Sequence, residues 1–336
     1  MKTLNSLFRF RDALIPNLLA WAYILFAYVF GFAAIMAESI LLNALGVILL
    51  AHGMVIAAYF IHECAHDSLF KKKRHNQFFG EILMWIIGIS YSTYEAIRYK
   101  HVRHHSDRSD VVSFNYREKL LENPKILKLI QGLEYLYIPA VEITLHALVI
   151  ILPFFEPSRK QYRSRVIVVM VLRVAFFAIL ASYSLQVLWL YPLSYLIFVH
   201  VMRFMDVHQH TYNLHLLDMP RGKEVQAYDR AFEQRNTYSN LISERYPWLN
   251  LLVLNFSYHN AHHDQQIQPW YRLPALHKKL YGNNRQQVLP FINLVKSYDE
   301  NRVARVLHAD PVDFDVKTDE GRQFIGVDGA SFLTAF

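Results

Sequence analysis

Long apolar blocks constrain this sequence more strongly than any other feature. They cover residues 13–36, 40–61, 166–181 and 187–205. A helix needs about 20 apolar residues to cross the ~30 Å hydrocarbon layer of a membrane. A soluble protein would distribute its hydrophobic residues along amphipathic elements, whereas this chain, which is 53% hydrophobic, gathers them in blocks. We therefore predict an all-α, multi-pass integral membrane protein with four transmembrane helices.

Short polar breaks join the blocks in pairs. The breaks lie at residues 38–39 and 182–186, so we predict two helical hairpins. Basic residues precede the first hairpin and follow it at residues 71–74. Because basic loops stay on the cytoplasmic side of a membrane, we expect both ends of this hairpin in the cytoplasm. The second hairpin returns the chain to the same side.

The remaining segments are more polar. Residues 78–94 are short for a span, so we expect them to lie at the interface. Residues 132–155 are interrupted by prolines, so we expect them to be interfacial or re-entrant. Whether 132–155 crosses the membrane stays open. Residues 107–128 are charged and are interpreted as a solvated connector. We predict one membrane domain over residues 1–280 and a cytoplasmic C-terminal tail over 281–336.

Charge and cysteine content exclude several classes of protein. The formal net charge is +7, but the basic residues flank the apolar blocks, which favours membrane lipid and argues against nucleic acid as the partner. Cys64 is the only cysteine. An internal disulfide, an iron–sulfur cluster and a Cys-rich zinc site are therefore excluded.

Histidines gather where the apolar segments end. Four clusters lie in the stretches IHECAHDSLF, KHVRHHSD, DVHQHTYN and YHNAHHD, which supply nine candidate ligands when His210 is counted from DVHQHTYN. Most are spaced three or four residues apart, and residues at these spacings share one face of a helix. Paired imidazoles on one face are able to chelate a metal ion. The predicted topology brings every cluster to the cytoplasmic side, as a histidine-rich cap on the membrane helices.

Two kinds of metal protein compete at this point. HECAH alone matches the H-E-x-x-H pattern, in which two histidines bind zinc and the glutamate acts as a base, so an intramembrane zinc hydrolase is an alternative. Zinc sites are nearly always four-coordinate, however, and nine imidazoles exceed one tetrahedral site. They suit two ions of higher coordination number, and imidazole ligation without thiolates favours iron. A haem-binding protein or a metal transporter would spread its histidines within the bilayer instead.

Carboxylates beside the clusters are candidates for orienting the imidazole rings through the second N–H group. Solvated helix-end charges explain the same residues equally well. They are Asp67, Asp107, Asp110, Asp206 and Asp264. His208 and His210 lie two residues apart, and we expect only one of them to face the site. Residues 312–336 have a mixed composition and predict no element.

The three boxes HECAH, HVRHH and HNAHH, in this order and with these apolar hairpins, resemble the membrane fatty acid desaturase superfamily. QHT and the stretches LNFSYHNAHHD and WYRLP agree, and the resemblance covers roughly residues 62–274. It implies a four-span helical fold with a cytoplasmic centre of two iron ions. By the resemblance, the ligands are His62, His66, His101, His104, His105, His210, His259, His262 and His263.

The resemblance also implies a reaction and its partners. The family uses O2 and two electrons to remove hydrogens from an unactivated acyl chain, so we expect a fatty acyl desaturase. Its substrate would be a fatty acyl lipid, an acyl-CoA or an acyl-carrier thioester. The chain has no HPGG haem-binding stretch, which implies an external electron donor, ferredoxin or cytochrome b5. Hydroxylases and ketolases of acyl chains, carotenoids or sterols in the same superfamily remain alternatives.

Overall fold

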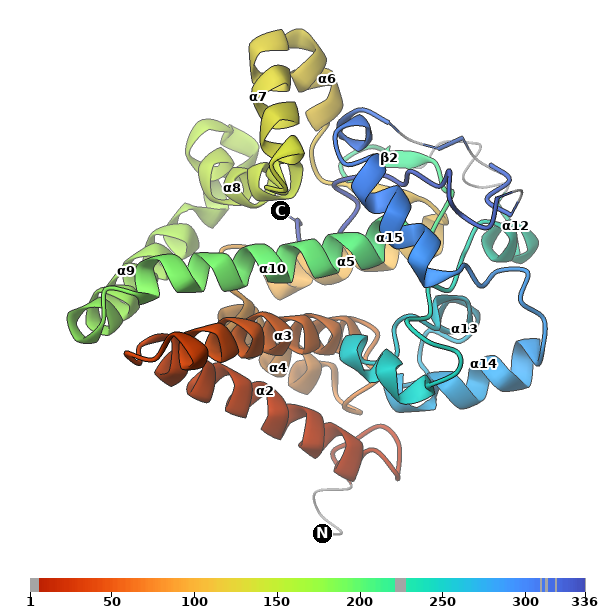
Figure 1. Cartoon of the computed structure of the whole chain (residues 1–336), viewed down its shortest axis with the longest axis horizontal. Helices are drawn as coiled ribbons and strands as arrows, with labels where there is room; N and C mark the ends of the chain where they lie inside the picture. Colours follow the sequence, from red (N-terminus) through yellow and green to blue (C-terminus); the bar gives the residue numbers. More distant parts are fainter. Residues whose placement is uncertain (1–5, 221–227, 309, 312–313, 318, 336) are drawn as a thin grey trace. The chain divides into compact units, whose positions relative to one another are not determined.

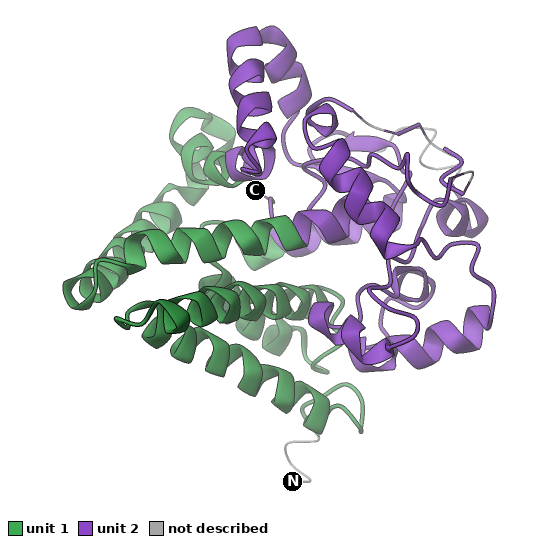
Figure 2. Ribbon diagram, in the orientation of Figure 1, with its two compact units in different colours: residues 1–96, 146–201, 336 green, residues 97–145, 202–335 purple. Residues whose placement is uncertain are grey.

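The structure, a computed structural model, describes residues 6–220, 228–308, 310–311, 314–317 and 319–335. The chain divides into two compact units. Unit 1 comprises residues 1–96 and 146–201, and unit 2 comprises residues 97–145 and 202–335 (Figure 2). Helices dominate both units (Figure 1). The predicted helical membrane fold is confirmed.

The first predicted hairpin forms in unit 1 from helices α2 (Leu14–Ile35) and α3 (Ile40–Ala65). The side chain of Asn43 fastens the turn, because its amide donates to three carbonyl oxygens at the end of α2 and in the loop. The two helices approach closely through small residues. A Cβ atom built on Gly46 would lie 2.8 Å from the carbonyl oxygen of Gly31. Close backbone approach at small residues is typical of helix packing in membranes.

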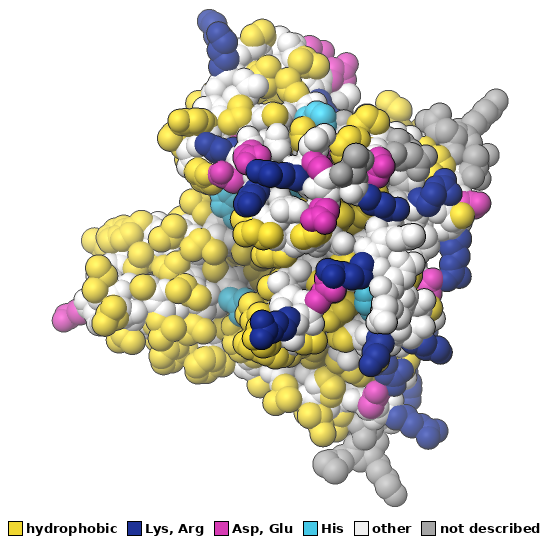
Figure 3. Space-filling model, turned by 45° about the vertical axis from the view of Figure 1, so that its right-hand side comes forward, with side chains coloured by type: hydrophobic (Ala, Val, Ile, Leu, Met, Phe, Trp, Pro, Cys, Tyr) yellow, Lys and Arg dark blue, Asp and Glu magenta, His cyan; other side chains and the backbone are white. Residues whose placement is uncertain are grey.

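The second predicted hairpin is built by α9 (Arg163–Tyr183) and α10 (Val187–Val207), and a 3₁₀ turn, η1 (Pro157–Tyr162), leads into it. Among the described residues, four helical stretches are long and apolar enough to cross a membrane, and they match the four predicted blocks. Large apolar side chains of α2 and α9 are exposed. Hydrophobic side chains cover the surface of these long helices at the left of Figure 3, as a lipid-facing surface requires.

Shorter helices form the two segments that were expected at the interface. Helix α4 (Lys73–Ile87) packs against α3 and ends at Gly88, which has a left-handed backbone. Residues 132–155 do not form one element. Helix α7 (Pro124–Tyr135) ends within them, and α8 (Ala140–Phe155) follows with Pro153 inside it. Helix α8 is 16 residues long and is not among the four candidate spans.

Unit 2 begins at Ile97, within helix α5 (Tyr94–Asp107), and this helix supplies the HVRHH box. Strand β1 (Asp110–Val112) follows and pairs in parallel with β2 (Leu214–Leu216). The interpretation of residues 107–128 as a solvated connector is wrong at its beginning, because β1 is buried along its whole length. The charge of Asp110 suggested exposure to solvent, but this residue lies in a buried strand whose pairing partner is distant in sequence. The connector then forms α6 (Tyr116–Glu122).

After β2, unit 2 contains several short helices, one of which carries the last histidine box. In chain order they are α12 (Arg230–Arg235), η2 (Pro247–Val253), α13 (His259–Asp264), η3 (Trp270–Arg272), α14 (Leu273–Tyr281), α15 (Phe291–Glu300) and η4 (Ala304–Val306). Asn250 organises the loop before α13. Its side-chain oxygen accepts from Ile242 and Ser257, and its amide donates to the carbonyl of Ser243. Leu254 then has a left-handed backbone, which redirects the chain into α13.

Candidate metal centre

The first histidine box lies at the C-terminal end of α3 in unit 1. His62 is in the last turn of the helix and His66 is its C-cap residue. Their ring centroids are 4.7 Å apart, as the spacing of four residues predicts. Their ligand atoms lie within 4.8 Å of each other. Glu63, which would be the base in the alternative zinc-hydrolase interpretation, accepts a hydrogen bond from the hydroxyl of Ser68 at 2.7 Å. This box therefore presents two imidazoles together.

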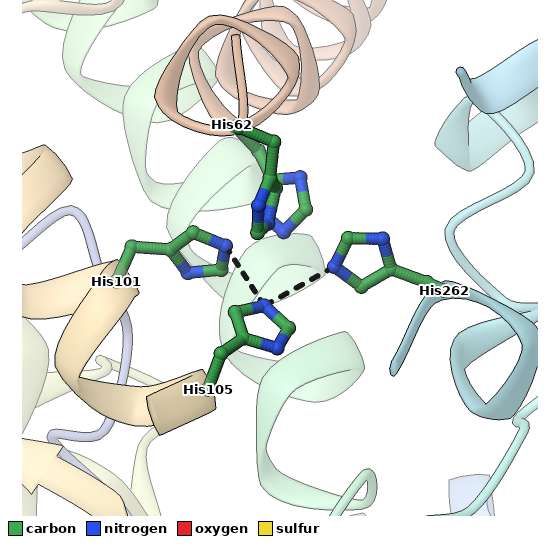
Figure 4. A group of neighbouring side chains, drawn as sticks. His62, His101, His105 and His262 are labelled. Atoms are coloured by element: carbon green, nitrogen blue, oxygen red, sulfur yellow. Dashed lines mark hydrogen bonds between the residues drawn. The ribbon is translucent and has the colours of Figure 1, made fainter. Parts of the chain in front are cut away.

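Three histidines of unit 2 form what we call the first group: His101, His105 and His262. The Nε2 atom of His105 lies 3.2 Å from Nε2 of His101 and 3.2 Å from Nε2 of His262. Figure 4 shows these rings turned toward one another, two from α5 and one from α13. All three side chains are buried.

Four other histidines of unit 2 form the second group: His104, His210, His259 and His263. His210 is central, because its Nε2 atom lies 3.1 Å from Nε2 of His104 and 2.8 Å from Nε2 of His259. His263 joins with ring centroids 4.7 Å from His210 and 4.6 Å from His259. The two groups are neighbours, since the rings of His105 and His263 are 4.3 Å apart.

Helical geometry explains how the H-x-x-H-H boxes are divided. Residues four apart on a helix differ by about 40° in direction and share a face, whereas adjacent residues differ by about 100°. In α5, His101 and His105 therefore point into the first group and His104 into the second. In α13 the assignment to the two groups is reversed. His259 and His263 point into the second group and His262 points into the first. Each box lies between the two groups and supplies both.

The small sheet brings the chain segments of the second group together. Strand β1 follows His104 and strand β2 follows His210, and their parallel pairing aligns Asp110 with Leu214. The carbonyl of Ser109, just before β1, accepts a hydrogen bond from Nδ1 of His104 at 2.8 Å. This bond fixes the tautomer and leaves the Nε2 lone pair of His104 directed into the group. Asn260 ties α13 to the same region through the hydroxyl of Ser239.

Burial keeps these imidazoles neutral. It lowers the pKa of His104 to about 4. The pKa values of His210 and His263 also lie well below the ordinary value, chiefly because of burial and then because of the neighbouring histidines. Neutral imidazole is the form that binds metal ions. At pH 7 the lone pairs of His104, His210 and His263 are therefore available without competition from protons.

The donor set fits transition-metal ions. Imidazole nitrogens bind such ions at about 2.0–2.1 Å, so two of them at right angles on one ion lie about 3 Å apart. The Nε2 separations of 2.8, 3.1 and 3.2 Å match this value. Within the described residues, Nε2 of His263 is buried and has no hydrogen-bond partner. A buried acceptor is costly without a partner, and a cation held by the second group would satisfy it.

Glu233 is a residue of the site that the sequence did not reveal. It lies on α12, and its carboxylate accepts a hydrogen bond from Nδ1 of His263 at 3.0 Å. Arg108 donates to the same carboxylate at 3.1 Å. Burial raises the pKa of Glu233, and Arg108 opposes this rise. A carboxylate behind a ligating histidine fixes the ring and increases its basicity. Glu233 stands far from the boxes in sequence and belongs to no motif.

We expect Glu233→Gln to weaken metal binding at the second group by about 10–100-fold, the usual effect of removing a carboxylate behind a ligand. An amide still accepts the hydrogen bond but carries no charge. The measurement is the fraction of metal retained at increasing chelator concentration. Glu244→Gln is the control, because Glu244 is exposed and pairs with Arg285. Equal retention in the two variants would show that Glu233 has no such role.

Other candidates from the sequence have different surroundings. His208 is not in either group: its ring packs on Phe204 and Phe324 with centroids 5.5 and 5.4 Å away. Of the two neighbouring histidines, His210 therefore faces the site. The side chains of the five aspartates are engaged as follows: Asp67 with Asn76, Asp107 with Arg103, Asp110 3.7 Å from Nδ1 of His104, Asp206 with Ser331, and Asp264 with Arg230.

Comparison with known proteins agrees with this geometry. The family model described as "Fatty acid desaturase" matches residues 38–294, about three quarters of the chain. No curated protein matches the chain. The matched region contains all three boxes, His210 and Glu233. The family is typically di-iron, and its members are oxidoreductases. The chain belongs to the fatty acid desaturase family.

Proposed function

We propose that this protein is an O2-dependent fatty acyl desaturase, which introduces a double bond into a lipid acyl chain at a histidine-ligated di-iron centre. One observation carries the proposal: the boxes of a desaturase family member supply two neighbouring groups of buried imidazoles in unit 2. Two groups with nitrogen donors alone suit two ions, whereas a zinc hydrolase requires one ion and an open position.

We propose nine iron ligands. The first group would bind one ion and the second group the other, and the resemblance of the first box to the family's adds His62 and His66 to the ligands. The ligands are thus His62, His66, His101, His104, His105, His210, His259, His262 and His263. Support for the first two comes from their pairing at the end of α3 and from their place in the family's first box. The iron pair would supply the oxidation of a methylene by O2, a reaction that protein side chains do not perform.

The protein's own residues have more limited tasks in this proposal. The imidazoles remain neutral and hold the metal, Glu233 and the Ser109 carbonyl fix two of the rings, and burial of seven of the nine ligands limits the access of water. Fixed rings matter because the site must keep its geometry while the charge of the ions changes. The acyl chain would lie among the apolar spans. The depth to which it enters would decide which of its carbons lies near the iron and reacts.

The proposed partners follow from the family and from the membrane helices. The substrate would be a fatty acyl lipid, an acyl-CoA or an acyl-carrier thioester, with O2 as the second substrate and ferredoxin or cytochrome b5 as the external electron donor. The histidine clusters would lie on the cytoplasmic side. The basic residues 71–74 after the first box support this orientation, since basic loops stay in the cytoplasm.

Expression in a host without its own desaturase tests the proposal. Fatty acid methyl esters from cells grown with and without O2 are separated and their double bonds located. We expect new monounsaturated chains only with O2, and none with His105→Ala, which removes the central ligand of the first group. Hydroxylated chains would instead assign the related hydroxylase reaction. An unchanged lipid profile, with a folded protein and a matching electron donor present, would contradict an acyl substrate.

A further inference from the structure

The end of the chain is built into unit 2. Residues 327–335, which we call the C-terminal strap, are buried except for Ala330, which is partly exposed. Small and polar residues are about as frequent among them as large apolar ones, so the burial of hydrophobic surface alone does not hold this segment in place. Gly326 gives entry to the strap. It has a φ of +76°, and a Cβ atom there would lie 2.1 Å from the carbonyl oxygen of Val207. Only glycine fits this crossing.

A buried ion-pair network anchors the beginning of the strap. The carboxylate of Asp328 receives two hydrogen bonds from Arg203, at 2.8 and 2.7 Å, and the third nitrogen of Arg203 donates to Glu134 at 2.8 Å. All three side chains are at most 1% exposed. The next backbone amide, that of Gly329, donates to Glu142 at 2.8 Å. Bidentate pairing of an arginine with a carboxylate stabilises the contact and also fixes its geometry.

Lys100 anchors the end of the strap to the metal-binding helix. The Lys100 side chain is 1% exposed. Its Nζ atom donates to the carbonyl of Ser331 at 2.6 Å and to the hydroxyl of Thr334 at 3.0 Å. The hydroxyl of Thr334 in turn donates to the carbonyl of Ser331. Lys100 directly precedes His101 in α5. The strap is thus fastened to the helix turn that presents the first group.

Between these anchors, Phe332 covers a ligand. Its ring lies beside that of His101, with centroids 5.4 Å apart, and the side chain is buried. The Nε2 atom of His101 lies 3.2 Å from Nε2 of His105, so packing of Phe332 against the ring restricts its rotation while it faces the group. Phe332 supplies an apolar wall and excludes water from the ring.

We propose that the C-terminal strap is a positioning element of the metal centre, in which Phe332 fixes the His101 imidazole and Lys100 couples the strap to α5. The proposal rests on the proposed di-iron function and adds a residue that no histidine box contains. The proposal concerns the first group, because the ring of Phe332 lies against that of His101. The second group has its own supports, Ser109 and Glu233. Loss of Phe332 should therefore affect one ion and leave the other.

The size of the effect follows from the role. Residues that orient a ligand typically change metal affinity by about 10–100-fold when they are replaced. We expect Phe332→Ala to retain one tightly bound iron and to bind the second about 10–100-fold more weakly. Phe332→Tyr keeps the ring and should bind both ions as the wild type does.

The test uses full-length protein in detergent, depleted of metal and titrated with Fe(II) under argon against a competing chelator. Phe324→Ala is the matched control. Phe324 is also buried and lies in the same C-terminal region, but it packs in a core with Tyr238, Leu294 and Val316. We expect Phe324→Ala to lower the melting temperature while both iron affinities stay unchanged, so a general loss of stability is distinguished from loss of positioning.

Each outcome bears on a different claim. One weakened site in Phe332→Ala, restored in Phe332→Tyr and absent in Phe324→Ala, supports the strap as a positioning element. Two unchanged affinities in Phe332→Ala would overturn it and leave the di-iron proposal intact. Equal weakening of both sites in Phe332→Ala and Phe324→Ala would also overturn it, because the role would then be structural. Failure of the wild type to bind two irons would contradict the proposed function itself.

Discussion

Replacement of His210 by alanine is expected to remove one bound iron and abolish activity, whereas replacement of His208 by alanine keeps both irons. The two residues lie in one short segment and are both buried. Only the ring of His210 contacts other candidate ligands, with Nε2 2.8 Å from His259 and 3.1 Å from His104. Truncation of His210 therefore removes the centre of the second group.

The measurement is iron per chain by elemental analysis of detergent-purified protein, with the host lipid profile alongside. His208→Ala is a demanding control, because it leaves a hole among Phe204, Tyr298 and Phe324 and should cost stability as other large-to-small core changes do. Full iron in His210→Ala, or equal iron loss in both variants, would refute the division of these two histidines into ligand and core residue.

Arg203→Met is expected to destabilise unit 2 by about 3–5 kcal/mol, the usual cost of breaking a buried ion pair by removing one partner. The substitution leaves Asp328 and Glu134 buried and without their cation. Burial already raises the pKa of Glu134, and Arg203 opposes the rise. Without Arg203 the two carboxylates are buried without a cation, and the cost of this unpaired charge favours release of the beginning of the strap.

Thermal melting in detergent, followed by tryptophan fluorescence, measures this loss. Arg285→Met is the matched control. Arg285 pairs with Glu244, but the two side chains are 65% and 43% exposed, and surface pairs contribute only about 0–1 kcal/mol. We expect a large drop in melting temperature for Arg203→Met and almost none for Arg285→Met. Similar melting of both variants would show that the buried network does not stabilise the fold.

The membrane part of the fold was predictable because its signal is local. A block of apolar residues reports a span without knowledge of any other segment, and all four predicted blocks coincide with α2, α3, α9 and α10. The boxes were equally visible, since helical spacing places His62 near His66 and His101 near His105.

The features that were missed depend on partners distant in sequence. Strand β1 was hidden because its strand partner lies about 100 residues later in the chain and because Asp110 suggested solvent. Glu233 could not be recognised in the sequence, because its role depends on a contact with His263, which lies 30 residues away in the chain. The strap gave none either, because Lys100 and Arg203 hold it from elsewhere in the chain. Periodicity identified which histidines pair, but the division of each H-x-x-H-H box between two groups required the structure.

The central claim is that the histidine boxes hold two iron ions, and the metal content of the wild-type protein tests it most directly. Protein purified in detergent from iron-supplemented cells is analysed for iron and zinc, beside His262→Ala and His62→Ala. We predict about two irons per chain in the wild type and fewer in both variants. About one zinc per chain, retained in His262→Ala and lost in His62→Ala, would contradict the di-iron centre and favour a zinc hydrolase built on the HECAH box.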